Sequence, residues 1–215
     1  FVQPTASALL TQTVNPPVGA TSLMIEAYGY GGRASSIYDS EYGEYFYFGG
    51  NGGDYARWSG TAQSVVIHVP GKNYTDGTYS DGTHARTVGG TILARACSGF
   101  RNSSSFGQLV RTGGDGGSRL ESDFDPSNPN RICGGGGGAG PTANGGNGQP
   151  WNETNTTVLG SGGASGGGLS GAGGTSVASP DGQNYGGGAA IYYDWTLPGA
   201  RQGQRGDAIL RLTWS

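Results

Sequence analysis

Glycine dominates this sequence and limits the folds open to it. The 215 residues include 46 glycines, about three times the ordinary share of roughly 7%. Of these, 26 lie between residues 113 and 188, with runs at 134–138, 166–168 and 186–188. The glycines lack the strict period of collagen, and no apolar stripe repeats every 3.6 residues over a full helical window. Collagen-like and helical folds are therefore excluded.

Two structures are compatible with such glycine runs. One is a disordered linker, because glycine loses more backbone entropy on ordering than any other residue. The other is packed polyglycine II, in which extended threefold helices without side chains lie close together and hydrogen-bond sideways. A linker of this length would need a second domain after it, and only one or two strands are expected there. The sequence therefore favours the packed glycine layer.

Alternation of apolar and polar residues predicts β-strands around the glycine runs. In the segment 21–30, Leu23, Ile25 and Ala27 fall on one face, and a period of two is typical of a strand with a buried face. The segments predicted to be strands are 2–14, 21–30, 63–69, 90–97, 108–111, 190–197 and 207–214. The expected fold is all-β, a β-sandwich or barrel-like body with polyglycine II-like segments and an extended N-terminal strand.

The N-terminal strand is long and ends at the hinge-like sequence Asn15-Pro16-Pro17. We therefore divide the chain into residues 1–18, the strand and its hinge, and residues 19–215, the glycine-rich β domain. A strand of this kind can be donated to the sheet of a neighbouring copy, and an unclosed head-to-tail repeat of that contact builds a filament. Alternatively, the strand completes its own sheet. The candidate assembly residues share one face: Val2, Ala6, Ala8, Leu10 and Val14.

Charge and motif content count against several functions. The net charge is -3 without a basic stripe, so nucleic-acid binding lacks its electrostatic footprint. No run of 18 apolar residues is present, so no membrane-spanning helix is expected. His68 and His84 have no Cys or His at metal-ligand spacing, and no phosphate-binding loop ends in Gly-Lys-Ser/Thr. We expect no metal, no cofactor and no enzymatic activity.

An aromatic and acidic segment, residues 37–48, is the strongest candidate for binding. Tyrosine adds contact area at low entropic cost and stacks on sugar rings, while carboxylates accept hydrogen bonds from hydroxyl groups. The alternative is that these aromatic side chains cap the small glycine core. A carbohydrate-active enzyme would need paired carboxylates, for which Glu41 and Glu44 are the nearest candidates. The candidate glycan or partner-binding residues are Tyr38, Tyr42, Tyr45, Phe46, Tyr47 and Phe48.

Several features indicate an extracellular protein. The chain begins with Phe1 rather than Met, so either the sequence is a fragment or a signal peptide has been removed, which would place the mature chain outside the cell. Cys97 and Cys133 form an even pair that could close one disulfide, although two buried thiols are the alternative. Four Asn-X-Ser/Thr patterns predict N-glycosylation, at Asn73, Asn102, Asn152 and Asn155.

Several segments, in this order, resemble the glycine-rich domain of phage tail-fibre and adhesin tips and related bacterial surface proteins. They are the strand 21–32, the motif Gly-Gly-Asn-Gly-Gly-Asp-Tyr-Ala-Arg at 49–57, the turn 69–71, the motifs 105–107 and 112–117, and the closing strand 206–214. The resemblance covers about residues 19–215. It implies a β frame around glycine-rich segments, exposed loops that bind a cell surface, and no catalysis. The aromatic segment 37–48 and the strand 2–14 depart from the pattern.

We therefore expect a non-enzymatic extracellular structural protein, a subunit of a surface fibre assembled with copies of itself by strand exchange and glycosylated. The alternative is a phage or viral tail-fibre tip adhesin on the virion surface, which binds a host glycan or an outer-membrane protein.

Overall fold

The fold was analysed in a computed structural model, in which thirteen strands and no helix are found among the described residues. These residues are 9–41, 43–71, 82–99, 104–120, 133–149, 164–175, 181–193 and 200–215. The described residues include no helix long and apolar enough to cross a membrane.

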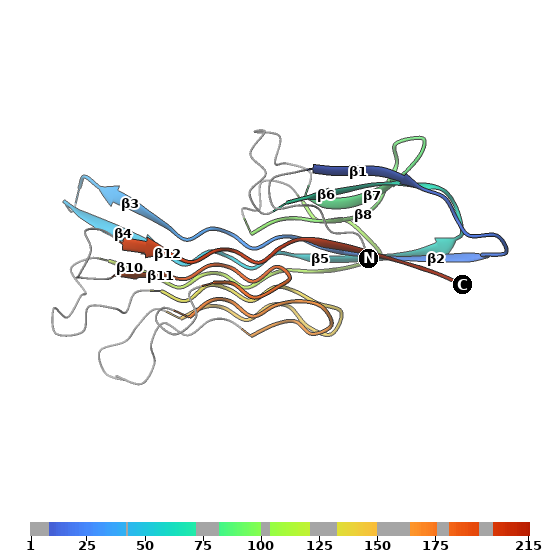
Figure 1. Cartoon of the computed structure of the whole chain (residues 1–215). Coiled ribbons are helices and arrows are strands. Elements are labelled where there is room, and N and C mark those ends of the chain that lie inside the picture. The colour runs from blue at the N-terminus through green and yellow to red at the C-terminus, as the bar shows by residue number, and fades with distance from the viewer. Residues whose placement is uncertain are drawn as a thin grey trace.

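Two four-stranded antiparallel sheets pack face to face at one end of the molecule and form what we call the base sandwich (Figure 1). One sheet has the order β13-β2-β5-β9 and the other β1-β6-β7-β8. The strands are β1 Leu9–Val14, β2 Ser22–Tyr28, β5 Tyr55–Thr61, β6 Val65–Pro70, β7 Thr83–Thr87, β8 Ile92–Ala96, β9 Leu109–Arg111 and β13 Ile209–Trp214. The expected all-β, sandwich-like class is thus confirmed.

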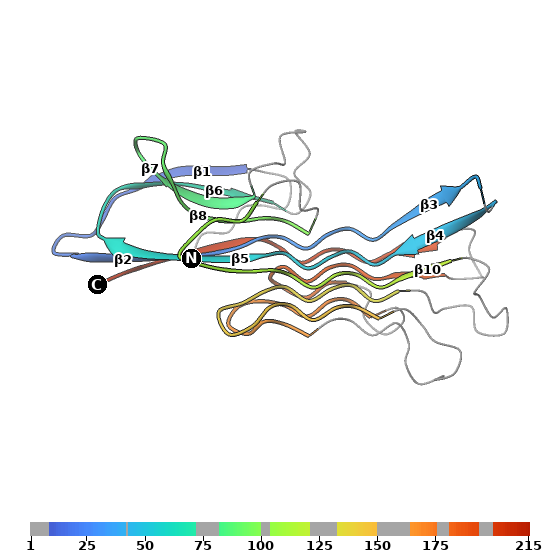
Figure 2. The ribbon, with the colours of Figure 1, turned by 180° about the vertical axis from the view of Figure 1, so that it is seen from behind.

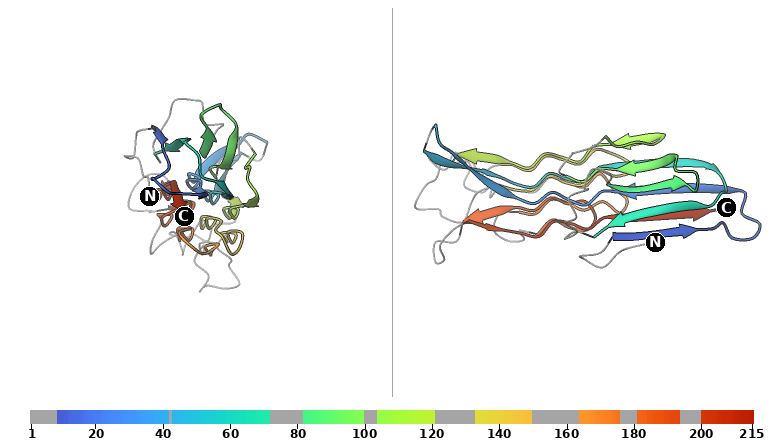
Figure 3. Two further views of the ribbon diagram at one scale, coloured as in Figure 1. Left: turned by 90° about the vertical axis from the view of Figure 1, so that its right-hand side faces the viewer. Right: turned by 90° about the horizontal axis from the view of Figure 1, so that it is seen from above.

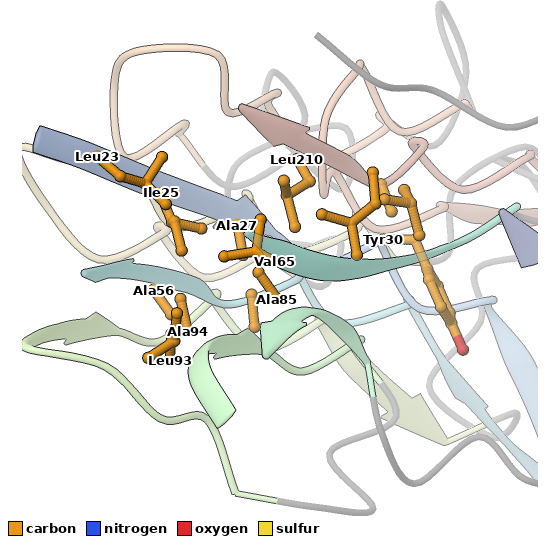
Figure 4. Close-up of a cluster of buried hydrophobic side chains, with 14 residues drawn as sticks. Leu23, Ile25, Ala27, Tyr30, Ala56, Val65, Ala85, Leu93, Ala94 and Leu210 are labelled. Carbon is orange, nitrogen blue, oxygen red and sulfur yellow. The ribbon is translucent and has the colours of Figure 1, made fainter. Parts of the chain in front are cut away.

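The core of the base sandwich consists of small and branched side chains from both sheets (Figure 4). Leu23, Ile25 and Ala27 of β2 are fully buried, as their alternation predicts, and burial of each large aliphatic side chain contributes roughly 1.5–3 kcal/mol. Tyr28 is buried on the opposite face of β2, because that face is also covered. The core cluster is Leu23, Ile25, Ala27, Tyr30, Ala56, Val65, Ile67, Val69, Ala85, Leu93, Ala94, Ala96, Ala208 and Leu210.

Each of the seven segments predicted to be strands contains one, and the sequence missed the others. Among those missed, β5 and β7 place Ala56 and Ala85 in the core, and such small residues give little apolar contrast with their neighbours. The remaining strands lie outside the base sandwich: β3 Ser35–Asp39, β4 Glu44–Phe48, β10 Ser118–Leu120, β11 Ile191–Tyr193 and β12 Ala200–Gln202.

Strand β1 belongs to the base sandwich of its own chain. It pairs antiparallel with β6 over its full length, from Leu9 opposite Pro70 to Val14 opposite Val65. Leu10 and Val14 are half-buried against the core. Of the two alternatives for the N-terminal strand, the structure has the second, because β1 completes its own sheet as an edge strand. The other predicted assembly residues, Val2, Ala6 and Ala8, lie outside the described residues.

Glycine-rich segments run from the base sandwich to a second group of strands at the far end of the molecule (Figures 1 and 2). Four of them connect a sandwich strand with a distal strand: β2 with β3, β4 with β5, β9 with β10, and β12 with β13. We call the whole set the glycine bundle. Its segments are 29–34, 49–54, 112–117, 133–140, 144–149, 164–174, 182–190 and 203–207.

Hydrogen bonds in the glycine bundle follow a period of three. Along the segment 133–140, successive N–H groups donate in turn to three different neighbouring segments, at N···O distances between 2.8 and 3.1 Å. Residues three apart therefore bond to the same neighbour. The N–H groups of Gly134 and Gly137 donate to Gln149 and Gly146 of the segment 144–149. Those of Gly135 and Gly138 donate to Gly174 and Gly171 of the segment 164–174. Those of Gly136 and Ala139 donate to Gly50 and Gly53 of the segment 49–54.

The close approach of these segments requires glycine. A Cβ atom at Gly136 would lie 2.1 Å from the carbonyl oxygen of Gly114, and one at Gly52 would lie 1.8 Å from that of Gly137. Real Cβ contacts below 3.0 Å essentially never occur. The segments thus lie side by side only because no side chain separates them.

Asn and Asp side chains complete the hydrogen bonding of the segment 112–117. Its N–H groups at 114 and 117 donate to the backbone of 134–137, and those at 113 and 116 donate to the side chains of Asp54 and Asn51. The N–H groups at 112 and 115 donate to Asn144 and Asn147. Each side-chain pair is spaced by three residues, so all six N–H groups have a partner, as buried backbone requires.

The molecule is elongated, and its two ends differ (Figures 1 and 3). The C-terminal residue Ser215 lies at the sandwich end, whereas the hairpin of β3 and β4 lies at the other end. A three-stranded sheet of order β10-β4-β3 and the pair β11-β12 are found at that end.

Candidate functional site

The hairpin of β3 and β4, which we call the tip hairpin, contains the whole candidate aromatic segment and carries, among the described residues, three exposed large hydrophobic side chains, Ile37, Tyr38 and Tyr45. A four-residue turn joins its strands. The carbonyl of Asp39 accepts the N–H of Gly43 at 2.8 Å, and the Asp39 carboxylate accepts the N–H of Glu41 at 2.9 Å. Gly43 has a φ of 71°, a left-handed conformation that favours glycine.

One face of the tip hairpin is formed by tyrosines. Tyr38 lies directly opposite Tyr45, with ring centroids 5.1 Å apart at 63°, the edge-to-face geometry that aromatic pairs prefer. Tyr45 also lies 6.2 Å from the ring of Tyr47. Tyr38 is 55% exposed and Tyr45 42% exposed, but Tyr47 is buried. The exposed pair Tyr38 and Tyr45 therefore lies next to the buried Tyr47, on the side toward the turn of the hairpin.

The opposite face of the tip hairpin is apolar. Ile37 lies across from Phe46, and Phe46 stacks on Phe48 with centroids 6.1 Å apart. Ile37 is 60% exposed, and the two phenylalanines are half-buried. Ile37 was within the predicted segment but was not singled out, although its alternation with Tyr38 already places it on the second face.

Tyr47 fixes the tip hairpin to the glycine bundle. Its side chain packs in a cluster with Ala34, Cys133, Ala189 and Ile191, and its carbonyl lies 3.6 Å from the Cys133 sulfur. The sequence left two roles open for the aromatic residues, binding a ligand or capping the glycine core, and in the structure these residues do not all have the same surroundings. Tyr47 caps the glycine core, whereas Tyr38 and Tyr45 face solvent.

Carboxylates gather near the turn of the tip hairpin, and Asp39 and Glu44 alternate with Tyr38 and Tyr45, which places them on the face of Ile37 and Phe46. Asp39 is directly opposite Glu44, and Glu41 is exposed in the turn between them. Like charges directly opposite each other disfavour the pair, so this end of the hairpin is not arranged for stability alone. Among the described residues, no group of three or more His, Cys, Asp or Glu side chains could hold a metal ion.

The structure does not describe all the predicted site residues. Tyr42 and the four glycosylation candidates, Asn73, Asn102, Asn152 and Asn155, lie outside the described residues. Their proposed roles stay predictions.

The predicted disulfide between Cys97 and Cys133 is not formed. Both side chains are buried thiols, and they lie in different surroundings. The carbonyl of Cys97 accepts the N–H of Asp54 at 2.9 Å next to the base sandwich, whereas Cys133 packs under Tyr47. The even number of cysteines suggested a bridge, but it carries no information on the distance between them.

Sequence reasoning also missed a buried polar cluster between the base sandwich and the glycine bundle. The hydroxyl of Tyr55 donates to Glu26 at 2.9 Å, and Arg211 forms an ion pair with Glu26 at 3.5 Å. Burial, reinforced by the Glu26 charge, raises the pKa of Tyr28 to about 12, and burial also raises the pKa of Tyr55. Both tyrosines therefore stay protonated well above the usual range. Ala139 of the bundle packs on these rings, so the cluster joins the two parts of the molecule.

Comparison with known proteins yields no relative. No family model, curated protein or solved structure matches this chain.

Proposed function

We propose that this protein is a non-enzymatic extracellular component of a surface fibre, on a cell or a virion, that presents a binding tip. In this proposal the base sandwich attaches the molecule, the glycine bundle is a polyglycine II-like stalk, and the tip hairpin binds the target. The observation that carries the proposal is the exposed pair Tyr38 and Tyr45 at the end of the molecule opposite Ser215.

The hydrogen bonding of the bundle supports its role as a stalk. Each segment is held by neighbours in several directions, so bending would break bonds between segments. Three bonds per turn to three neighbours is the arrangement expected of packed threefold helices. The likeness of the glycine motifs to those of fibre and adhesin tips favours the same interpretation.

A neutral or basic glycan is the ligand class that best suits the tip. Exposed tyrosine rings offer apolar faces for sugar rings and hydroxyls for hydrogen bonds. The carboxylate of Glu41, which is exposed in the turn between the two strands, can accept hydrogen bonds from sugar hydroxyls. The three carboxylates near the turn, Asp39, Glu41 and Glu44, would repel sialylated or sulfated glycans.

Glycan binding can be tested directly. The purified protein is applied to an array of neutral, amino-substituted and acidic glycans, together with Tyr38→Ala, Tyr45→Ala and the control Phe106→Ala. Phe106 is 53% exposed but lies beside β8. We expect binding to neutral or amino glycans that falls at least tenfold in the two tyrosine variants only. Equal binding by all three variants, or binding to no glycan, would contradict the proposed tip function.

A second candidate is a filament subunit assembled by exchange of β1. The favouring observation is that β1 contributes only the half-buried Leu10 and Val14 to the core and is followed by an exposed connection in which Val18 is fully exposed. A neighbour's β1 could replace it at low cost. Electron microscopy of the intact chain and of a 1–15 deletion distinguishes the candidates. Filaments from the intact chain alone support strand exchange, and single particles from both count against it.

A further inference from the structure

Among the described residues, strand β3 lies at the edge of its sheet. It is the outer strand of the sheet β10-β4-β3, and among the described residues its strand partner is β4 alone. A strand with one neighbour leaves half of its N–H and C=O groups facing outward. Ser35 and Ser36 are exposed together with Ile37 and Tyr38.

Edge strands normally carry features that prevent pairing with another chain, such as a proline, a lysine or a bulge. The sequence of β3, Ser-Ser-Ile-Tyr-Asp, has neither proline nor lysine. Its register with β4 is continuous from Ser35 to Asp39, so no bulge twists the edge away. The strand is therefore suited to pairing.

We propose that β3 pairs antiparallel with β3 of a second copy of this chain, around a twofold axis at Ile37. In this register Ile37 lies opposite Ile37 of the second copy. Ser35 then lies opposite Asp39, and Ser36 opposite Tyr38. The two three-stranded sheets become one sheet of six strands.

Side-chain chemistry selects this register. Ile37 lies across from Phe46 within each copy, so centring on Ile37 creates one apolar row of Phe46, Ile37, Ile37 and Phe46 across both copies. Across the new contact Asp39 then faces the hydroxyl of Ser35, and no carboxylate of the second copy lies opposite it. A pairing centred on Tyr38 would instead place Asp39 opposite the exposed Ile37, which buries a charge against an apolar group.

This contact goes beyond glycan binding and does not depend on it. Tyr38 and Tyr45 point to the face opposite Ile37 and Phe46, so pairing leaves them open. Because the two β3 strands run antiparallel, the two elongated molecules extend in opposite directions (Figure 1). Both tyrosine pairs then lie on one face of the six-stranded sheet, and two linked sites bind a multivalent surface more tightly than one.

The first test is the mass of the full chain in solution. Sedimentation of the intact protein should show a concentration-dependent species of twice 21.8 kDa. Ile37→Lys places charges opposite each other across the edge and should leave only the monomer. The matched control Val88→Lys, at a residue 67% exposed in the base sandwich, should dimerise like the parent. A monomeric parent, or a dimer unaffected by Ile37→Lys, would overturn the proposal.

The second test fixes the register. Opposite residues in an antiparallel pair have Cα atoms about 4.5–5.5 Å apart, within the range of about 4.4–6.8 Å that a disulfide spans. Under a glutathione buffer, Ile37→Cys should therefore form a covalent dimer on non-reducing gels, whereas Ser36→Cys, opposite Tyr38, should form little. The two native cysteines are buried. Equal crosslinking of both variants, or none, would refute the register. Monovalent glycan affinity, measured on Ile37→Lys, reports separately on the proposed function.

Discussion

Replacement of Gly136 by alanine is the sharpest perturbation of the glycine bundle. The new Cβ would lie 2.1 Å from the Gly114 oxygen and 2.9 Å from the Asp115 oxygen, both backbone atoms. To reach ordinary contact at 3.4 Å, the segments 133–140 and 112–117 must separate by about 1.3 Å. The bonds from the N–H groups of Gly114 and Gly117 cross this boundary at 2.9 Å and would be lost.

Two lost hydrogen bonds cost about 0.5–1.5 kcal/mol each, and overpacking adds about 1–3 kcal/mol. We therefore expect Gly136→Ala to lower the free energy of unfolding by about 2–6 kcal/mol. For a chain of this size, that corresponds to a Tm lower by roughly 4–24 °C.

The assay is thermal and urea unfolding followed by tryptophan fluorescence and circular dichroism. Gly89→Ala is the matched control, because a Cβ there meets nothing closer than the Thr87 hydroxyl at 3.7 Å. Its Tm should change by no more than about 2 °C, with either sign. If both variants melt at the same temperature, the bundle is not packed as described and the reasoning fails.

Three further outcomes are expected. Asn51→Ala removes the acceptor of the Gly116 N–H and should lower stability by about 1–3 kcal/mol; an unchanged urea midpoint would show that water replaces the side chain. In the folded protein the pKa of Tyr28 is about 12, above the ordinary value of 10.0 that applies to the unfolded chain. Between these two pH values the unfolded chain loses the proton and the folded protein keeps it. The free energy of unfolding should therefore fall as pH rises from 10 toward 12, by up to about 1.4 kcal/mol per pH unit. In urea titrations from pH 8 to 12, the free energy of unfolding should fall less steeply with pH in Tyr28→Phe than in the parent protein. If it falls equally steeply in both proteins, the Tyr28 proton is not the cause. Finally, Cys97 and Cys133 are buried thiols, so a thiol reagent should label neither of them in the native protein and both after denaturation. If neither is labelled under denaturing, non-reducing conditions, the two cysteines form a disulfide.

The sequence predicted the strands whose inward positions are large and apolar. Ile67 and Val69 alternate with His68, and Leu210 and Leu212 alternate with Arg211, so the period of two is visible. In β7 the buried positions include Thr83 and Ala85, which look like solvent-facing residues of any loop. The pattern fails where the core is built from small side chains.

Neighbours within the glycine bundle could not be predicted, because glycine has no side chain to specify register. One signal was present but not used. Asn51 and Asp54 are spaced by three residues, as are Asn144 and Asn147, and each pair bonds to N–H groups on a single segment. A threefold spacing of short polar acceptors inside a glycine run therefore indicates a position next to another segment.

The tip hairpin was predicted as a set of residues but not as a surface. Alternation along 35–39 and 44–48 assigns Tyr45 and Tyr47 to one face, yet only Tyr45 is exposed. The difference comes from Cys133 and Ile191, which are distant in sequence. Separation in sequence also explains why the disulfide was predicted but is not formed. Nothing near Cys97 or Cys133 in the sequence indicates where the other cysteine lies in the fold.

The stalk is the part of the proposal on which the rest depends, and hydrogen-bond scalar couplings in an isotope-labelled sample test it most directly. We predict couplings from the Gly136 nitrogen to the Gly50 carbonyl carbon and from the Gly135 nitrogen to the Gly174 carbonyl carbon, with slow amide exchange along 134–139. Fast exchange of these amides and no coupling between the segments would contradict the packed bundle, and with it the placement of the tyrosine tip at the end of a stalk.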